Sequence, residues 1–167
     1  MRMKTRIAAL ITAAIFLSAC SASSSTANKE KAAADFEQTV SLIESGSYQY
    51  AVRSATPSGG KTIQITSEYT MKAKDGKYEA LLPYFGRAYS ASYGGSQGVE
   101  FIGEPEDLEI TRKDNKNKVS VSFTITTDAE TYTVNLEVGG SGFGTLIISN
   151  PRKTSISYHG LVSGLAD

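Results

Sequence analysis

Beyond residue 47, apolar and polar residues alternate along most of the chain. In the clearest stretch, the apolar residues from Val119 to Ile125 alternate with Ser120, Ser122 and Thr124. The same period of two recurs in several other segments, namely 48–52, 63–73, 132–138, 146–148 and 156–158. Such alternation is typical of antiparallel strands that place one face on a core and the other in water.

The alternating segments are separated by short turns, which favours a meander of neighbouring strands. Asp75-Gly76, between two lysines, suits a type I′ hairpin, and Asn150-Pro151 begins the last turn. The pattern predicts about nine strands, over residues 47–55, 61–73, 77–82, 97–102, 107–113, 118–127, 130–139, 144–149 and 154–159. A flat sheet of this size would leave much apolar surface bare, so the sheet must curve, close or fold into two layers.

A helical period precedes the strands. Phe36, Val40 and Ile43 recur at the spacing of one helix face, which predicts a helix over residues 28–46. Gly46 follows the last apolar residue and can adopt the left-handed conformation that ends many helices. We therefore expect an α+β domain that is mostly β: one N-terminal helix, then a strongly curved antiparallel meander sheet, either a sandwich or an incomplete barrel.

Residues 1–19 have the pattern of a signal peptide. Arg2, Lys4 and Arg6 form a basic start, and an uncharged, mostly apolar run extends from Ile7 to Phe16. This run is about half of the roughly 20 residues that a helix needs to cross a bilayer. The segment therefore predicts an export signal and not a membrane anchor.

Leu17-Ser18-Ala19-Cys20 resembles the lipobox of bacterial lipoproteins, in which a signal peptidase cleaves before an invariant cysteine. The resemblance implies that Cys20 carries a diacylglyceryl group and an acylated amino terminus, and several acyl chains together give stable anchoring. The alternative is a free, buried cysteine. A single cysteine excludes an internal disulfide framework and a multi-cysteine zinc site. We expect three parts: 1–19, a signal peptide; 20–30, a flexible polar tether; and 31–167, a single β-rich domain.

The net charge changes when the signal peptide is removed. The chain has 17 basic and 17 acidic residues, and loss of Arg2, Lys4 and Arg6 leaves a formal charge of −3. A mildly acidic domain has no electrostatic footprint for nucleic acid, so we expect no such partner. Position 21 is Ser and not Asp, so the lipoprotein resemblance implies the outer membrane. The lack of an acidic cluster after Cys20 favours the periplasmic side, with the cell surface as the alternative.

Residues 81–98 break the alternation and hold four aromatic residues, one arginine and four glycines. We take the aromatic and cationic residues as the candidate binding residues, namely Tyr84, Phe85, Arg87, Tyr89 and Tyr93. Tyrosine rings suit interfaces and stacking on sugars or peptides, and Arg87 could pair with a carboxylate or phosphate. The alternative is structural: Pro83 and Gly86 form a corner, the aromatic side chains seal the open end of the sheet, and Arg87 pairs with an internal acid.

The same segment carries a family resemblance. Leu82-Pro83-Tyr84-Phe85-Gly86-Arg87-Ala88-Tyr89, followed by Tyr93 and Gly98-Val99-Glu100-Phe101, resembles a lipoprotein family of Bacteroides-type bacteria, domain-of-unknown-function family 4251. Ser149-Asn150-Pro151-Arg152 and Ile156-Ser157-Tyr158-His159-Gly160 are similar to the closing hairpin of that family. The resemblance covers residues 31–164, and it implies no activity, substrate or catalytic residue.

The sequence shows no convincing catalytic or metal constellation. His159 is the single histidine and lacks the partner motif of a zinc enzyme. The carboxylates around Pro105 are candidates for glycoside chemistry or calcium binding, namely Glu100, Glu104, Glu106, Asp107 and Glu109. Their spacing at a polar strand connection is more typical of a solvated turn. We expect no catalytic residue, no metal and no cofactor.

These observations predict a lipid-anchored cell-envelope protein that binds a ligand or partner without catalysing a reaction. Its expected partners are the membrane, through the lipid on Cys20, and a small molecule, peptide or protein. Two alternatives stay open. One is a carboxylate-dependent envelope hydrolase acting on glycan or peptidoglycan, which needs two acids that converge in a cleft. The other is a structural or assembly factor of an envelope complex, which an exposed apolar patch would support.

Overall fold

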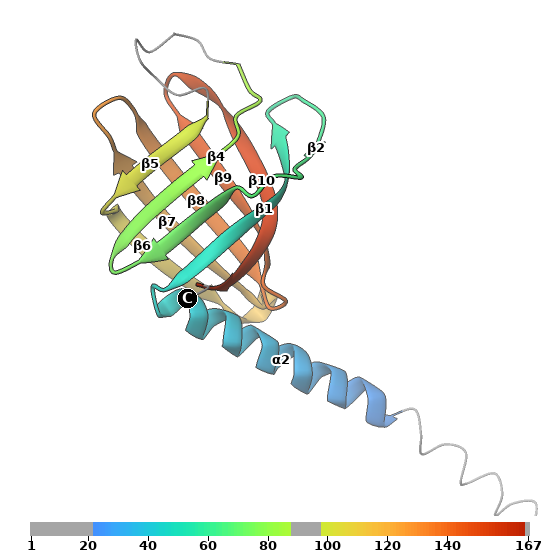
Figure 1. Ribbon diagram of the computed structural model, residues 1–167. Coiled ribbons are helices and arrows are strands. Elements are labelled where there is room, and N and C mark those ends of the chain that lie inside the picture. Colours follow the sequence, from blue (N-terminus) through green and yellow to red (C-terminus); the bar gives the residue numbers. More distant parts are fainter. Residues whose placement is uncertain (1–21, 88–97, 166–167) are drawn as a thin grey trace, which may run out of the picture. The chain divides into compact units, whose positions relative to one another are not determined.

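The computed structural model describes residues 22–87 and 98–165, which form one helix and an antiparallel sheet (Figure 1). The chain divides into two units, Met1–Ala34 and Asp35–Asp167, so the boundary falls inside the helix α2 (Ala22–Glu44). The sequence predicts a flexible tether up to residue 30, but the chain is helical from Ala22 onward. Alanine, lysine and glutamate are strong helix formers, and they make up all of residues 29–34. No helix of the described part is long and apolar enough to cross a bilayer.

The described residues from Tyr48 onward form ten strands and one short 3₁₀ helix, η1 (Asp114–Lys116). The strands are β1 (Tyr48–Pro57), β2 (Ile63–Gln64), β3 (Thr70–Lys74), β4 (Lys77–Leu82), β5 (Val99–Gly103), β6 (Glu106–Lys113), β7 (Lys118–Thr126), β8 (Thr131–Gly139), β9 (Phe143–Asn150) and β10 (Lys153–Gly164). The expected class, mostly antiparallel β with one N-terminal helix, is confirmed.

The order of the strands explains why the sheet curls. The sheet runs β5-β4-β3-β1-β10-β9-β8-β7-β6, with β2 paired to β1 off this path. The edge strands β5 and β6 are consecutive in the chain and are separated only by Glu104 and Pro105. Two opposite edges can be joined by so short a link only if the sheet bends round on itself, and β5 indeed contacts β7. The result is a half-barrel (Figure 1).

Aromatic side chains fill the concave side of the sheet. The rings of Tyr78 and Phe123 lie 4.2 Å apart, and those of Phe101 and Tyr132 lie 5.6 Å apart. The inward residues of β7 and β8 are all buried, as their alternation predicts. The Tyr48 hydroxyl lies 3.4 Å from that of Tyr78, and burial raises the pKa of both phenols. The interior is thus a packed core.

Two glycines lie opposite each other where β9 pairs with β10. Gly160 of β10 lies opposite Gly144 of β9. A Cβ on Gly160 would lie 3.0 Å from the Tyr50 ring and 2.2 Å from the Ala51 carbonyl oxygen. The Tyr50 hydroxyl donates hydrogen bonds at 2.9 Å to the carbonyls of Gly144 and Tyr158. A side chain on Gly160 would therefore collide with β1 and the Tyr50 ring, and one on Gly144 would collide with the Glu137 carbonyl oxygen, 2.6 Å from its Cβ.

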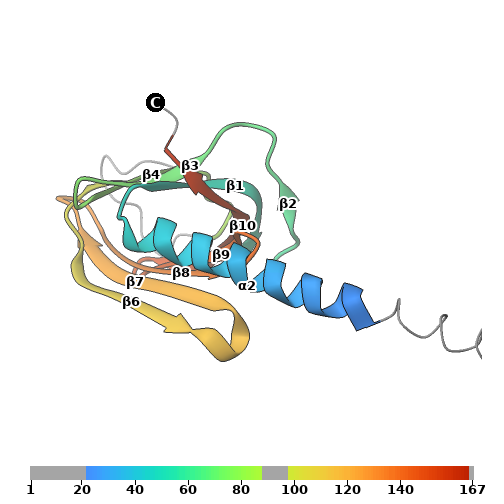
Figure 2. The same ribbon diagram turned by 90° about the horizontal axis from the view of Figure 1, so that it is seen from below.

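The C-terminal part of α2 closes one end of the half-barrel (Figure 2). Phe36, Val40 and Ile43 are buried, as their spacing predicts. Arg112 of β6 lies with its guanidinium 5.2 Å from the Phe36 ring centroid and forms an ion pair with Glu37. The helix ends at Glu44 and Gly46 follows with φ of +64°, which confirms the expected left-handed glycine.

The prediction of one long strand over 61–73 is wrong, because the structure has two strands there, β2 and β3. The break coincides with a bulge in the neighbouring strand β1, where the register shifts between Val52 and Ser54. Only the second half, β3, buries its alternate residues. The hairpin that follows is confirmed as type I′, since Asp75 and Gly76 have φ values of 52° and 75°.

Candidate binding site

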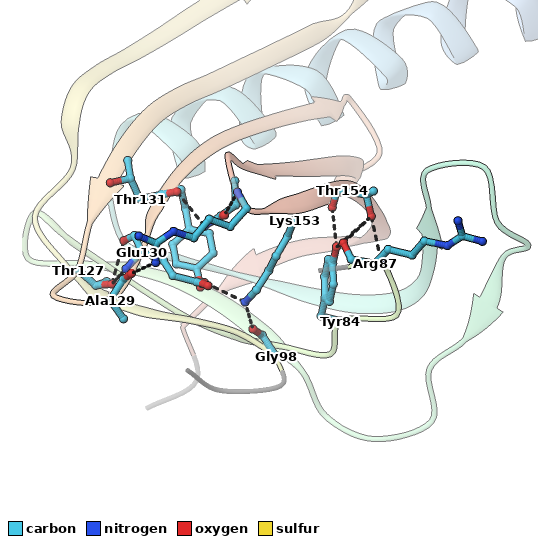
Figure 3. Close-up of polar contacts among 12 residues, drawn as sticks. Tyr84, Arg87, Gly98, Thr127, Ala129, Glu130, Thr131, Lys153 and Thr154 are labelled. Carbon is cyan, nitrogen blue, oxygen red and sulfur yellow. Dashed lines mark hydrogen bonds and ion pairs between the residues drawn. The ribbon is translucent and has the colours of Figure 1, made fainter. Parts of the chain in front are cut away.

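The residues that follow β4 are held against the start of β10 at the end of the half-barrel opposite α2 (Figures 1 and 3). The Tyr84 hydroxyl lies 2.9 Å from the carbonyl oxygens of Arg87 and Thr154 and 3.0 Å from the Thr154 hydroxyl. The Arg87 N–H donates to Thr154 Oγ1 at 3.1 Å, and the Thr154 N–H donates to the Arg87 carbonyl at 3.0 Å. The Tyr158 hydroxyl donates to the Pro83 carbonyl at 2.8 Å. The backbone of residues 83–87 is therefore fixed on β10.

Gly86 is required for this arrangement. A Cβ at this position would lie 2.4 Å from the Tyr84 hydroxyl and 2.6 Å from Thr154 Oγ1. Any side chain would therefore push apart the two groups that hold the loop. Pro83 and Gly86 do form a corner, as the structural interpretation of this segment expects.

Two side chains of the corner are left facing solvent. Phe85 is 43% exposed. Arg87 is exposed, and within the described residues its guanidinium has no ion pair or hydrogen bond. Figure 3 shows this side chain pointing away from the hydrogen-bonded groups. The suggestion that Arg87 pairs with an internal acid finds no support here. Tyr89, Tyr93 and Cys20, the other candidate residues, lie outside the described part of the chain.

A buried ion pair lies beside the corner. Lys153 Nζ lies 2.9 Å from Glu130 Oε2, and the two side chains are only 10% and 5% exposed. The Tyr132 hydroxyl donates a further hydrogen bond to the same carboxylate. Lys153 also donates to the Gly98 carbonyl at 3.3 Å and lies 5.6 Å from the centroid of the Tyr84 ring (Figure 3). The pair therefore connects the turn before β8, the start of β10 and the residue before β5.

The environment keeps Glu130 ionised. Burial alone would raise the pKa of this carboxyl, but the Tyr132 hydroxyl and the Lys153 ammonium together outweigh burial and bring the pKa below its ordinary value. A carboxylate held in this state is not suited to act as a general acid near neutral pH. Its evident role is to neutralise and orient Lys153.

Consecutive residues of β10 hold both sides of the 88–97 segment. Thr154 binds the backbone of Arg87, and Lys153 binds the carbonyl of Gly98. Glu130, Lys153 and Thr154 were not predicted as site residues, because Glu130 precedes β8 and the other two begin β10 next to a turn. The sequence does contain one signal for Glu130. It lies two positions before Tyr132, so it continues the alternate residues of β8 that face the core. Lys153 gives no such signal, because the register of β10 shifts between Lys153 and Ile156.

A hollow of about 280 Å³ adjoins the ion pair and is lined by the β7–β8 and β9–β10 turns, namely residues 127–131 and 150–152. Asn150 Nδ2 donates to the Thr131 carbonyl at 3.1 Å, and Arg152 Nη1 donates to the Ala129 carbonyl at 3.3 Å. These bonds join the two turns to each other. The hollow is small for a ligand pocket, for which about 300–1,000 Å³ is usual.

The residues considered for catalysis do not converge. All five carboxylates around Pro105 are exposed along β5 and β6, and within the described ranges no group of three or more His, Cys, Asp or Glu could hold a metal. His159 faces solvent, with Nδ1 3.2 Å from the Thr145 hydroxyl. Gly94-Gly95-Ser96-Gln97-Gly98 has the spacing of a nucleophile elbow, but that motif needs a helix after it and Gly98 leads into β5.

These features define a helix followed by an antiparallel half-barrel, with an aromatic corner fixed at the end opposite the helix. The family model of Domain of unknown function (DUF4251) matches residues 30–162, and the chain belongs to this family. The two sequence stretches that carry the resemblance, which include Tyr84 and Arg152, meet at this end of the sheet.

A solved structure shares the fold. A DUF4251 family protein from Bacteroides eggerthii DSM 20697 is similar with a TM-score of 0.60 and 15% sequence identity, over 78% of this chain and 88% of that chain. At this identity the likeness extends to the fold alone. A comparison with curated proteins finds no match.

Proposed function

We propose that the protein is a lipid-anchored envelope protein whose half-barrel binds a partner through the corner formed by residues 83–87. The observation that carries this proposal is the contrast within the corner itself. Its backbone is fixed by Tyr84 and Thr154, whereas Phe85 and the Arg87 guanidinium face solvent. A fixed backbone with exposed side chains loses little conformational freedom on binding, which favours affinity.

The chemistry of the two exposed groups sets the kind of partner. A guanidinium binds carboxylate or phosphate with two parallel hydrogen bonds. An aromatic ring beside it adds apolar area, and aromatic residues and arginine are enriched where partners bind most strongly. We therefore propose a partner that presents an anionic group next to an apolar one. The role is binding and not catalysis.

The test uses a photo-crosslinking residue in the native lipoprotein. We expect p-benzoylphenylalanine at position 85 to give a discrete adduct when intact cells are irradiated. Arg87→Gln should remove that adduct, because the anionic contact is lost. The same crosslinker at Phe143, which is 62% exposed on β9, is the control for a general aromatic surface. Equal labelling at both positions, or an adduct that survives Arg87→Gln, would exclude the corner as the binding site.

The anchor is the second part of the proposal and rests on the lipobox-like stretch that ends at Cys20. The proposed location is the outer membrane, with the half-barrel on the periplasmic side. We expect the protein to incorporate radiolabelled palmitate and to fractionate with outer membranes. Cys20→Ala should lose the label, and Ser18→Ala, one of the two small residues before it, should retain it. A labelled Cys20→Ala variant would contradict the anchor without affecting the corner.

A further inference from the structure

The outer face of β3, β4 and β5 carries a second surface, distinct from the corner. Gln49, Lys72, Glu79 and Ile102 lie opposite one another across β1, β3, β4 and β5. Their neighbours in each strand point into the core, so this row faces solvent. The strands concerned lie side by side in Figure 1.

Two hollows meet on this face. One of about 660 Å³ lies over the β3–β4 hairpin, and one of about 530 Å³ lies over β4 and β5. They share Glu79 and Ile102 and therefore adjoin, and we call the two together the outer groove. Each volume is within the usual range for small-ligand sites, about 300–1,000 Å³.

Two large apolar side chains of the outer groove are exposed. Ile102 is 70% exposed and Leu81 is 54% exposed, and Ile102 is the most exposed large apolar side chain of the described residues. The two are diagonal neighbours on adjacent strands, since Ile102 lies opposite Glu79 and Leu81 lies opposite Glu100. Covering both at once would remove a single apolar strip from water, which is favourable.

The charges of the outer groove change sign along its length. The hairpin end is lined by Lys72, Lys74 and Lys77, and in the described structure none of them has an ion pair. Asp75 and Glu79 lie there too, which leaves one net positive charge. The far end is lined by Glu79, Glu100 and Asp128 without a cation. An anionic group therefore fits at the hairpin end only.

The hairpin contains an electrostatic conflict that a ligand would relieve. Lys74 and Lys77 lie directly opposite each other beside the turn. Like charges in this position destabilise a sheet. Lys72 differs, because it lies opposite Glu79. Lys74 and Lys77 are therefore the lysines of the groove that have no carboxylate opposite them in the sheet.

We propose that the outer groove binds an amphiphile with a single anionic headgroup, such as a fatty carboxylate. The headgroup lies between Lys74 and Lys77, and the apolar chain extends over Ile102 and Leu81. This site is independent of the corner, because it shares no residue with Tyr84, Phe85, Arg87 or Thr154.

The test is a titration of the full chain, labelled with ¹⁵N, with dodecanoate below its micelle concentration. We expect saturable shifts of the amide signals of residues 72–77 and 102. Acetate, which has the headgroup without the chain, and dodecyl maltoside, which has the chain without the charge, should each bind at least about tenfold more weakly. Equal binding of acetate or of the maltoside would overturn the amphiphile assignment.

Matched variants locate the site. Ile102→Ser and the double variant Lys74→Gln/Lys77→Gln should each weaken dodecanoate binding by about tenfold or more. The controls Phe143→Ser and Lys61→Gln replace an exposed apolar residue and an exposed lysine elsewhere, and should bind as the parent does. Arg87→Gln should also bind dodecanoate normally, which keeps this proposal separate from the corner. Equal losses in the control variants, or shifts outside the groove only, would overturn it.

Discussion

One end of the half-barrel is closed by the apolar face of α2, whereas the other is held by a buried ion pair and hydrogen bonds to the backbone. At the first end Phe36, Val40 and Ile43 supply apolar area, which is favourable wherever it is buried. At the second end Lys153 and Thr154 form bonds that depend on distance and angle. The end closed by α2 therefore stabilises the fold, whereas the hydrogen bonds at the other end fix the position of the backbone there. Exposed side chains of defined geometry occur at the second end.

The largest effect is expected from a substitution at the end that α2 closes. Ile43→Ala removes a fully buried side chain and should lower the free energy of unfolding by about 3 kcal/mol. Urea denaturation followed by circular dichroism measures the change. Ser41→Ala, on the exposed side of the same helix, should change stability by less than about 0.5 kcal/mol. A loss below about 1 kcal/mol for Ile43→Ala would mean that α2 does not hold this end.

The next effect is expected from a substitution in the ion pair at the opposite end. Lys153→Met leaves the Glu130 carboxylate buried without its cation and should lower the free energy of unfolding by about 3 kcal/mol in the same urea measurement. Adding Glu130→Gln should recover more than half of the loss, because the uncompensated charge disappears. If the double variant is less stable than Lys153→Met alone, the ion pair is not the source of the effect.

A pH titration should distinguish the two ends further. The pKa of Glu130 is lower in the folded protein than its ordinary value of 4.5. The stabilisation from Glu130 is therefore present above about pH 4.5 and is lost as pH falls through the lowered folded pKa. We expect the stability difference between the parent and Glu130→Gln to shrink below pH 4.5. The difference between the parent and Ile43→Ala should not show this dependence, and a parallel decline in both would contradict the assignment.

The smallest expected effect concerns the corner. Tyr84→Phe removes a hydroxyl with partners in Arg87 and Thr154 and should cost about 1 kcal/mol. Hydrogen exchange at the Arg87 and Thr154 amides should become faster, because both donate within this network. The amides of β7 and β8 serve as internal controls and should exchange as before. Unchanged protection at Arg87 would show that the corner is held without Tyr84.

Most of the fold could be predicted because alternation reports directly on which face of a strand is buried. The inward residues of β7 and β8, the helix face with Phe36 and the Asp75-Gly76 turn all follow from local pattern. The predicted meander of neighbouring strands is present in β3–β5 and in β6–β10. The pairing of β1 with β10, from the far end of the chain, could not be predicted. The break between β2 and β3 depends on a bulge in β1, which is also a property of the pairing.

Less of the candidate site could be predicted. Tyr84, Phe85 and Arg87 stood out because their segment interrupts the alternation, but their roles differ: Tyr84 fixes the corner, and Phe85 and Arg87 are presented by it. Lys153 and Glu130 are 23 residues apart, and charged residues in turns usually face water. Their burial follows from the curl of the sheet, which no local pattern contains.

The position of β10 has a consequence for how the chain folds. The final strand lies in the middle of the sheet, between β1 and β9. Its pairing with both neighbours connects β1 to β9, so the sheet is incomplete until β10 is in place. Completing the sheet therefore requires pairing between distant parts of the chain, which slows folding. Slow completion of the sheet would help to keep the chain unfolded during transit, which suits the export proposed above.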